Sequence, residues 1–184
     1  MKNLRIYNLV IVSVVLCTLL SCKDNTTSKG EKKDIHSDIE HNKDHVHHNH
    51  IKTATVQFNN AQTGKAFKQY IDIKTALVHT DAQQVKASAK KLAEITENTM
   101  LKTVIDAIIA SNDIEEQRRA FVAVTTQMEA MLRGALSSGE VYKQYCPMAF
   151  NNEGGYWLST EKEIRNPYFG DQMLKCGSVS EIIK

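Results

Sequence analysis

The chain has little proline and almost no tryptophan. Its 184 residues include only two prolines, Pro147 and Pro167, and a single tryptophan, Trp157. Residues 56–140 therefore contain no proline, the residue that most strongly breaks a helix. Long uninterrupted helices can form in this part of the chain, and the segment after residue 140 is expected to have another structure.

Several motifs that would indicate a reaction or a cofactor are missing. The cysteines form neither a CxxC pair nor a four-cysteine set, which argues against thioredoxin chemistry and a structural zinc site. The CxxCH motif of a c-type haem is missing as well. No Ser, His and Asp set, paired carboxylate motif or phosphate-binding loop stands out, and only His79 lies in the part expected to fold. We therefore do not expect an enzyme.

An excess of one charge is also missing. The formal net charge is +2, and residues 1–21 contain Lys2 and Arg5 but no acidic residue, so without them the charge falls to zero. No basic stripe with interleaved aromatic residues occurs, and we expect no nucleic-acid partner.

The main hydrophobic run is short and lies at the N-terminus. It covers residues 9–20, follows Lys2 and Arg5, and leads into LLSC, where Ser21 precedes Cys22. This order is typical of a secretory signal, and the run is too short to span a bilayer comfortably. LLSC also resembles the bacterial lipobox. We predict a signal peptide at residues 1–21 and lipidation of Cys22, which would anchor the protein to a membrane of the bacterial cell envelope, facing the periplasm or the outside. A plain signal peptide with an incidental cysteine is the alternative.

Residues 22–55 are polar and charged, and they contain too little apolar surface to form a core. We predict a disordered tether. Its second half is rich in histidine, with Asp and Glu between the histidines, a composition typical of loose binding of zinc, copper or nickel. The candidate accessory metal ligands are His36, His41, His45, His47, His48 and His50. The alternative is a solvated linker that needs only to be polar.

Residues 56–184 are predicted to be one mainly α-helical domain. Apolar residues recur at helical spacing in four blocks, 67–78, 85–95, 101–109 and 114–135. Turn signals such as HTD, SND and SSG separate the blocks, and Asn112, with Glu115 three residues later, is a candidate cap for the fourth. Short connections make neighbouring helices antiparallel. We expect an antiparallel up-and-down bundle of about four helices.

The segment after Gly139 is predicted to form a short C-terminal β-hairpin or irregular cap. VYKQYCPMAF and YWLS are rich in aromatic and β-branched residues, and the turn-forming NNEGG lies between them. NPYFG then indicates a second turn, and DQMLK a helical turn.

This C-terminal segment contains a candidate metal site whose ligands are the sulfur atoms of cysteine and methionine side chains. Cys146 and Met148 are separated by one residue, and Met173 and Cys176 are three apart, which would place them on one face of a helical turn. Two thiolates with thioethers form a soft donor set that favours Cu(I) and its congener Ag(I). The residues alone leave two alternatives open. An exported domain often contains a disulfide, here Cys146 to Cys176, and the methionines can be packing residues.

The same segment resembles an uncharacterised bacterial domain family. CPMA, YWLS, NPYFG and MLKCG occur in order over residues 141–177, and a looser similarity extends over residues 56–184. The family occurs in small lipoproteins and as a C-terminal extension of periplasmic adaptor (membrane-fusion) proteins of copper and silver efflux pumps. The resemblance implies a compact helical domain whose cysteines and methionines handle copper. The corresponding residues here are Cys146, Met148, Met173 and Cys176.

The sequence therefore leads to two hypotheses. The first is an envelope lipoprotein that binds copper as Cu(I), with silver or zinc as other candidate ions, for copper tolerance, sequestration or delivery to an efflux system. The second is a non-enzymatic interaction module with a Cys146–Cys176 disulfide. It would dock on an envelope or efflux-pump partner through the aromatic residues Tyr156, Trp157, Tyr168 and Phe169.

Overall fold

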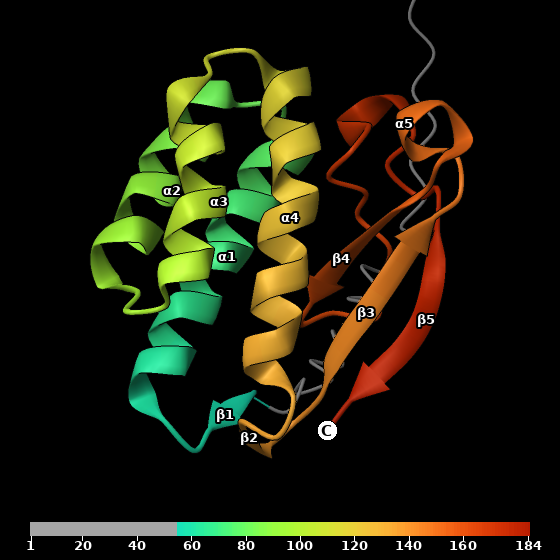
Figure 1. Cartoon of the computed structure of the whole chain (residues 1–184). Helices are drawn as coiled ribbons and strands as arrows, with labels where there is room; N and C mark the ends of the chain where they lie inside the picture. The colour runs from blue at the N-terminus through green and yellow to red at the C-terminus, as the bar shows by residue number, and fades with distance from the viewer. Residues whose placement is uncertain (1–54) are drawn as a thin grey trace, which may run out of the picture. The chain divides into compact units, whose positions relative to one another are not determined.

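A computed structural model describes residues 55–184 and shows a mainly helical domain with a small β-sheet (Figure 1). The four main helices are α1 (Ala61–Val78), α2 (Ala82–Ile95), α3 (Thr99–Ala110) and α4 (Ile114–Leu132). Consecutive helices pack against each other, and α4 also contacts α1, which confirms the predicted bundle. The predicted signal peptide, the lipidated Cys22 and the histidine tract lie outside the described residues.

Each main helix begins at a side chain that accepts hydrogen bonds from its first turn. Asn60, Asp81 and Asn98 cap the first three, and Asp113 caps α4 by accepting from the backbone amides of Glu115 and Glu116. Such caps satisfy amides that have no partner within the helix. The prediction that Asn112 caps the fourth helix is wrong by one residue. Asp113 takes the position because its carboxylate accepts from two amides.

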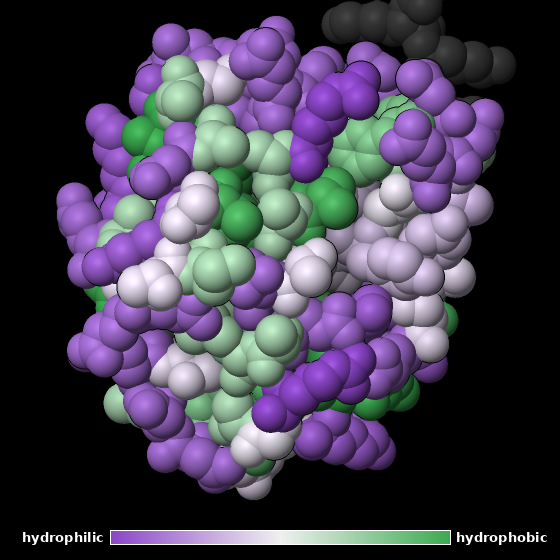
Figure 2. Space-filling view, in the orientation of Figure 1, coloured by the Kyte–Doolittle hydropathy of each residue, from purple (hydrophilic) through white to green (hydrophobic). Residues whose placement is uncertain are grey.

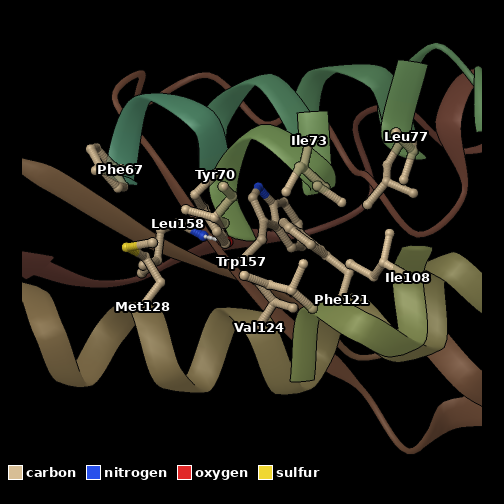
Figure 3. Close-up of a cluster of buried hydrophobic side chains, with 14 of the residues drawn as sticks. Phe67, Tyr70, Ile73, Leu77, Ile108, Phe121, Val124, Met128, Trp157 and Leu158 are labelled. Atoms are coloured by element: carbon tan, nitrogen blue, oxygen red, sulfur yellow. Dashed lines mark hydrogen bonds between the residues drawn. The ribbon is translucent and has the colours of Figure 1, made fainter. Parts of the chain in front are cut away.

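The hydrophobic core fills the space between the helices and extends into the sheet (Figure 3). Phe67, Tyr70, Ile73 and Leu77 project from α1, and Phe121, Val124 and Met128 from α4, as Figure 3 shows. Trp157 and Leu158 enter the same cluster from the sheet, and both are fully buried. Helices and sheet therefore share one core.

The strands form two antiparallel sheets. The two-stranded sheet pairs β1 (Gln57–Phe58) with β2 (Leu136–Ser138). The three-stranded sheet has the order β4 (Gly155–Ser159), β3 (Val141–Cys146), β5 (Ser178–Ile183). A short helical element, α5 (Ala149–Asn152), connects β3 to β4, and the 3₁₀ helix η1 (Gly170–Gln172) precedes β5. The predicted hairpin is present as β3 and β4. The SSG sequence, predicted only as the turn that ends the fourth helix, overlaps strand β2. Strand β5 was not predicted.

Hydrogen bonds and ion pairs attach the sheet to the helices. The Tyr70 hydroxyl accepts from the Leu158 backbone amide at 2.9 Å and lies 2.9 Å from the hydroxyl of Thr125. The ammonium group of Lys143 on β3 pairs with Glu129 on α4 at 2.9 Å. These contacts fix β4 and β3 against α1 and α4.

Buried Arg118 attaches α4 to the loop before η1. Its guanidinium donates to the Pro167 carbonyl at 3.0 Å, to the Leu77 carbonyl at 3.2 Å and to the Thr80 hydroxyl at 3.1 Å. It also pairs with the exposed carboxylate of Glu115. One side chain therefore holds the NPYFG turn against the end of α1.

The surface in Figure 2 is mostly hydrophilic, with small hydrophobic areas over α3 and α4 that polar side chains interrupt. Within residues 55–184, no helix is both long and apolar enough to cross a membrane.

Candidate soft-metal centre

The structure brings Cys146 and Cys176 together from segments thirty residues apart in the chain. Cys146 is the last residue of β3 and is fully buried. Cys176 precedes β5 and is partly exposed. Both are free thiols, and their Sγ atoms lie 3.0 Å apart.

This separation lies between the values for a disulfide and for a shared metal ion. A disulfide needs a separation of about 2.0 Å. Two sulfurs that bind one tetrahedral Zn²⁺ ion with bonds of about 2.3 Å are about 3.8 Å apart, and an ion with fewer ligands holds its two sulfurs at least as far apart. From 3.0 Å the sulfurs must therefore approach by about 1 Å or separate by about 0.8 Å.

The two methionines of the predicted site have different surroundings. Met148 follows Pro147 at the end of β3 and is 47% exposed. Met173 is half-buried and follows η1, with φ −143° and ψ 54°, which is not helical. The predicted helical turn over DQMLK is therefore present only at Asp171 and Gln172, which belong to η1, and does not extend to Met173. Met173 and Cys176 are joined instead by a turn in which the Cys176 amide donates to the Met173 carbonyl at 3.0 Å.

Asn166 positions the backbone of Cys176. The Asn166 side-chain amide donates to the Cys176 carbonyl at 2.8 Å, and its Oδ1 accepts from the Tyr168 amide at 2.8 Å. Its backbone amide donates to the Leu174 carbonyl at 2.8 Å. Asn166 is fully buried, so it closes the loop of residues 166–176 from inside.

Two glycines permit the close approach of the chains at the cysteines. Gly177 has φ +141°, and a Cβ there would lie 2.8 Å from the Tyr145 carbonyl oxygen and 2.9 Å from the Trp157 ring. Gly155 pairs with Cys146, and a Cβ there would lie 2.6 Å from the Tyr168 ring. Contacts this short do not occur for real Cβ atoms, so any larger residue would move the strands that carry the cysteines.

The turn after Met148 is left-handed. Phe150, Asn151 and Asn152 have φ values of 54°, 59° and 70°. Left-handed conformation costs an L-residue roughly 1–2 kcal/mol, and asparagine tolerates it better than phenylalanine. The Phe150 ring packs edge-on against Tyr168 with centroids 4.9 Å apart. Strain of this kind is often found at functional sites, and here it follows the CPM segment directly.

The neighbouring thiol changes the acidity of Cys176. The hydrogen bond with Cys146 raises the pKa of the Cys176 thiol, and burial adds to the increase. At neutral pH a metal ion would therefore have to displace the Cys176 proton.

The predicted aromatic docking surface is not formed as a unit. Trp157 and Tyr168 are buried, at 0% and 3% exposure, and Phe169 is half-buried. Tyr156 alone is well exposed, at 43%. The Trp157 and Tyr168 rings pack against each other, with centroids 5.9 Å apart, because they belong to the core.

The predicted accessory ligands His36, His41, His45, His47, His48 and His50 lie outside the described residues. His79 is exposed at the end of α1, where its backbone amide bonds to the Leu77 and Thr75 carbonyls. Within residues 55–184, no group of three or more His, Cys, Asp or Glu side chains is arranged to hold a metal ion. The described chain begins next to β1, at the end of the domain opposite to α5 (Figure 1).

The contributions of Asn166 and Phe150 do not follow from the sequence. An Asn-Pro dipeptide signals a turn, and NNEGG signals residues with positive φ. Neither signal shows that Asn166 bonds to a residue ten positions later, or that Phe150 itself is left-handed.

Comparison with known proteins adds one similarity. Residues 66–139 match the model of DUF3347, a family of proteins of unknown function. The match covers most of α1 and all of α2, α3, α4 and β2. It ends before β3, so the DUF3347 match contains neither cysteine of the pair. No curated protein and no solved structure matches the chain.

Proposed function

We propose that this protein is a lipid-anchored protein of the bacterial envelope that binds Cu(I), or its congener Ag(I), between Cys146 and Cys176. The observation that supports the proposal is the 3.0 Å separation of the two sulfurs, although Cys146 ends β3 and Cys176 lies two residues before β5. Thiolate donors select soft monovalent ions over hard cations. The role would be copper tolerance, sequestration or delivery to an efflux system, as the resemblance of the C-terminal segment implies.

The exposure of the two cysteines supports binding followed by transfer. Cys146 is shielded from water, which would slow loss of the ion, and Cys176 is reachable from outside. An incoming thiolate of a partner can replace Cys176 first and Cys146 second. Met148 is exposed beside Cys146 in the chain and would supply a thioether during this exchange.

The test is competition for Cu(I) against a chelator of known affinity under reducing conditions. Residues 23–184 are compared with Cys146→Ser, Cys176→Ser and a variant with all six tether histidines changed to asparagine. We expect one tightly held ion, lost in either serine variant and retained in the histidine variant. Retention of tight binding in both serine variants would exclude the cysteine pair as the site.

A second candidate function is an interaction module in which the same two cysteines form a structural disulfide. The adjacency of the sulfurs supports it equally, because they need to approach by only about 1 Å. This candidate predicts that the isolated oxidised protein resists thiol titration and that its reduction lowers stability by roughly 3–4 kcal/mol. A reduced protein of unchanged stability would contradict it.

A further inference from the structure

We propose that Cys176 is a thiol-exchange site: once oxidation has joined the two free thiols in a Cys146–Cys176 disulfide, a dithiol partner opens it by attacking the sulfur of Cys176, not that of Cys146. This inference rests on the proposed function, because opening the disulfide frees both thiolates for the metal ion. The ligand class is a thiol that donates two electrons. The specificity comes from the unequal placement of the two sulfurs.

Access to the two sulfurs is the first argument. Thiol exchange requires the attacking thiolate to reach one sulfur of the disulfide, from the side away from the other, so its rate depends on access. Cys146 is 0% exposed and lies at the end of the central strand β3. It pairs with Gly155 of β4, and the Tyr168 ring lies close to Gly155. Cys176 lies in the surface segment between η1 and β5 and is partly exposed. An external thiol can therefore approach Cys176 only.

The rigid backbone around Cys176 is the second argument. Its amide and carbonyl are both bonded, to Met173 and to Asn166, and a Cβ at Gly177 would lie only 2.8 Å from the Tyr145 carbonyl oxygen. The Cys176 sulfur therefore stays next to Cys146 when both are thiols, at 3.0 Å. Opening and closing the disulfide needs a movement of about 1 Å at the sulfurs and no rearrangement of the strands.

The exchange balances in two steps. The first partner thiolate bonds to Cys176 Sγ, the Cys176–Cys146 bond breaks, and its electron pair goes to Cys146, which takes up a proton or binds the metal ion. The second partner thiol then attacks the partner's own sulfur in the mixed disulfide, and Cys176 leaves as a thiolate. The partner becomes a disulfide, and its two electrons have reduced the disulfide of this protein.

The experiment identifies the attacked sulfur directly. The full chain is oxidised with glutathione disulfide, freed of small molecules, exposed briefly to reduced glutathione and quenched with an excess of an alkylating reagent. Peptide mass spectrometry then measures two products. Attack at Cys176 gives glutathione on Cys176 and the alkyl group on Cys146, and attack at Cys146 gives the reverse pattern.

We expect the first product to exceed the second at least tenfold in the folded protein. In urea the ratio of the first product to the second should fall to about one, because both cysteines are then accessible. An equal or reversed ratio in the folded protein would overturn the proposal, and so would a failure of the two cysteines to form a disulfide. Binding of Cu(I) is measured separately, so loss of metal binding with the Cys176 adduct retained would count against the proposed function alone.

Discussion

At the scale of single residues, Cys176 should determine how metal binding depends on pH. The pKa of its thiol is raised by the hydrogen bond with Cys146 and by burial, whereas a free thiol has a pKa of about 8.5. A metal ion binds the thiolate, so affinity rises with pH until the thiol pKa is passed.

We therefore predict that the apparent Cu(I) affinity of the protein keeps rising above pH 8.5. Cys176 alone should contribute up to about tenfold per pH unit, since one proton is released. Chelator competition at a series of pH values measures this slope, and Cys176→Ser should show a smaller one. A slope that levels off below pH 8 in the unmodified protein would disagree with the raised pKa.

Lys74 on α1 provides a second prediction at this scale. It is 6% exposed, and burial lowers its pKa from 10.5, an effect that nearby Glu161 partly offsets and Arg165 strengthens. Between its lowered pKa and 10.5 the unfolded chain binds more protons than the folded one, so the stability contribution of Lys74 rises with pH.

The change to test is Lys74→Met. Relative to the unmodified protein, the variant should be most stable near pH 7, and its advantage should shrink as the pH approaches 10.5. Urea unfolding at several pH values measures the difference in free energy. Lys90→Met, at an exposed position of α2, is the matched control and should show no such trend. A difference for Lys74→Met that does not change with pH would count against the effect of burial.

At the scale of elements, the left-handed turn of α5 follows Met148 and connects β3 to β4. Asn151 is exposed and has φ 59° and ψ 41°, so its backbone conformation matters more than its contacts. Glycine adopts this conformation without strain, whereas a β-branched residue does not.

We predict that Asn151→Gly is at least as stable as the unmodified protein. Asn151→Val should be less stable than the unmodified protein by about 1–2 kcal/mol. Thermal or urea unfolding measures the order. The same change at Glu153, which is exposed and has φ −70° and ψ −27°, should have a smaller effect. A valine at residue 151 that costs no more than one at residue 153 would show that the turn is not left-handed in solution.

The elements differ in how well the sequence predicts them. Helical spacing and turn residues are local signals, so the four main helices and their order follow from the sequence. Asn112 and Asp113 are both good capping residues, and only the geometry of the loop between α3 and α4 decides which of them caps α4. β5 was missed because its pairing with β3 is long-range, and a six-residue strand has no equally strong local signal.

At the scale of the whole molecule, the helices and the sheet depend on each other. The DUF3347 match covers residues 66–139, but Trp157 and Leu158 fill the core between α1 and α4. We predict that a fragment of residues 55–139 loses the cooperative thermal transition seen by circular dichroism. A sharp transition of the fragment would show that the helices fold without the sheet.

Trp157→Ala in the full chain should lower the free energy of unfolding by about 3–5 kcal/mol.

The candidate site could be predicted from the sequence only in part. Cys146 and Cys176 are the two cysteines of the expected domain, so their association was a natural prediction. The positions of Met148 and Met173 depend on Pro147 and on the end of η1, which are details of the backbone. The role of Asn166 requires the closed loop of residues 166–176, which no pattern of residues reveals.

The most direct test of the proposed function is X-ray absorption of the protein of residues 23–184 loaded with one Cu(I). We predict at least two sulfur neighbours of copper in the unmodified protein, and no tightly held copper with two sulfur neighbours in Cys146→Ser or Cys176→Ser. A first coordination shell of nitrogen alone, unchanged in both serine variants, would show that copper binds elsewhere and would contradict the account.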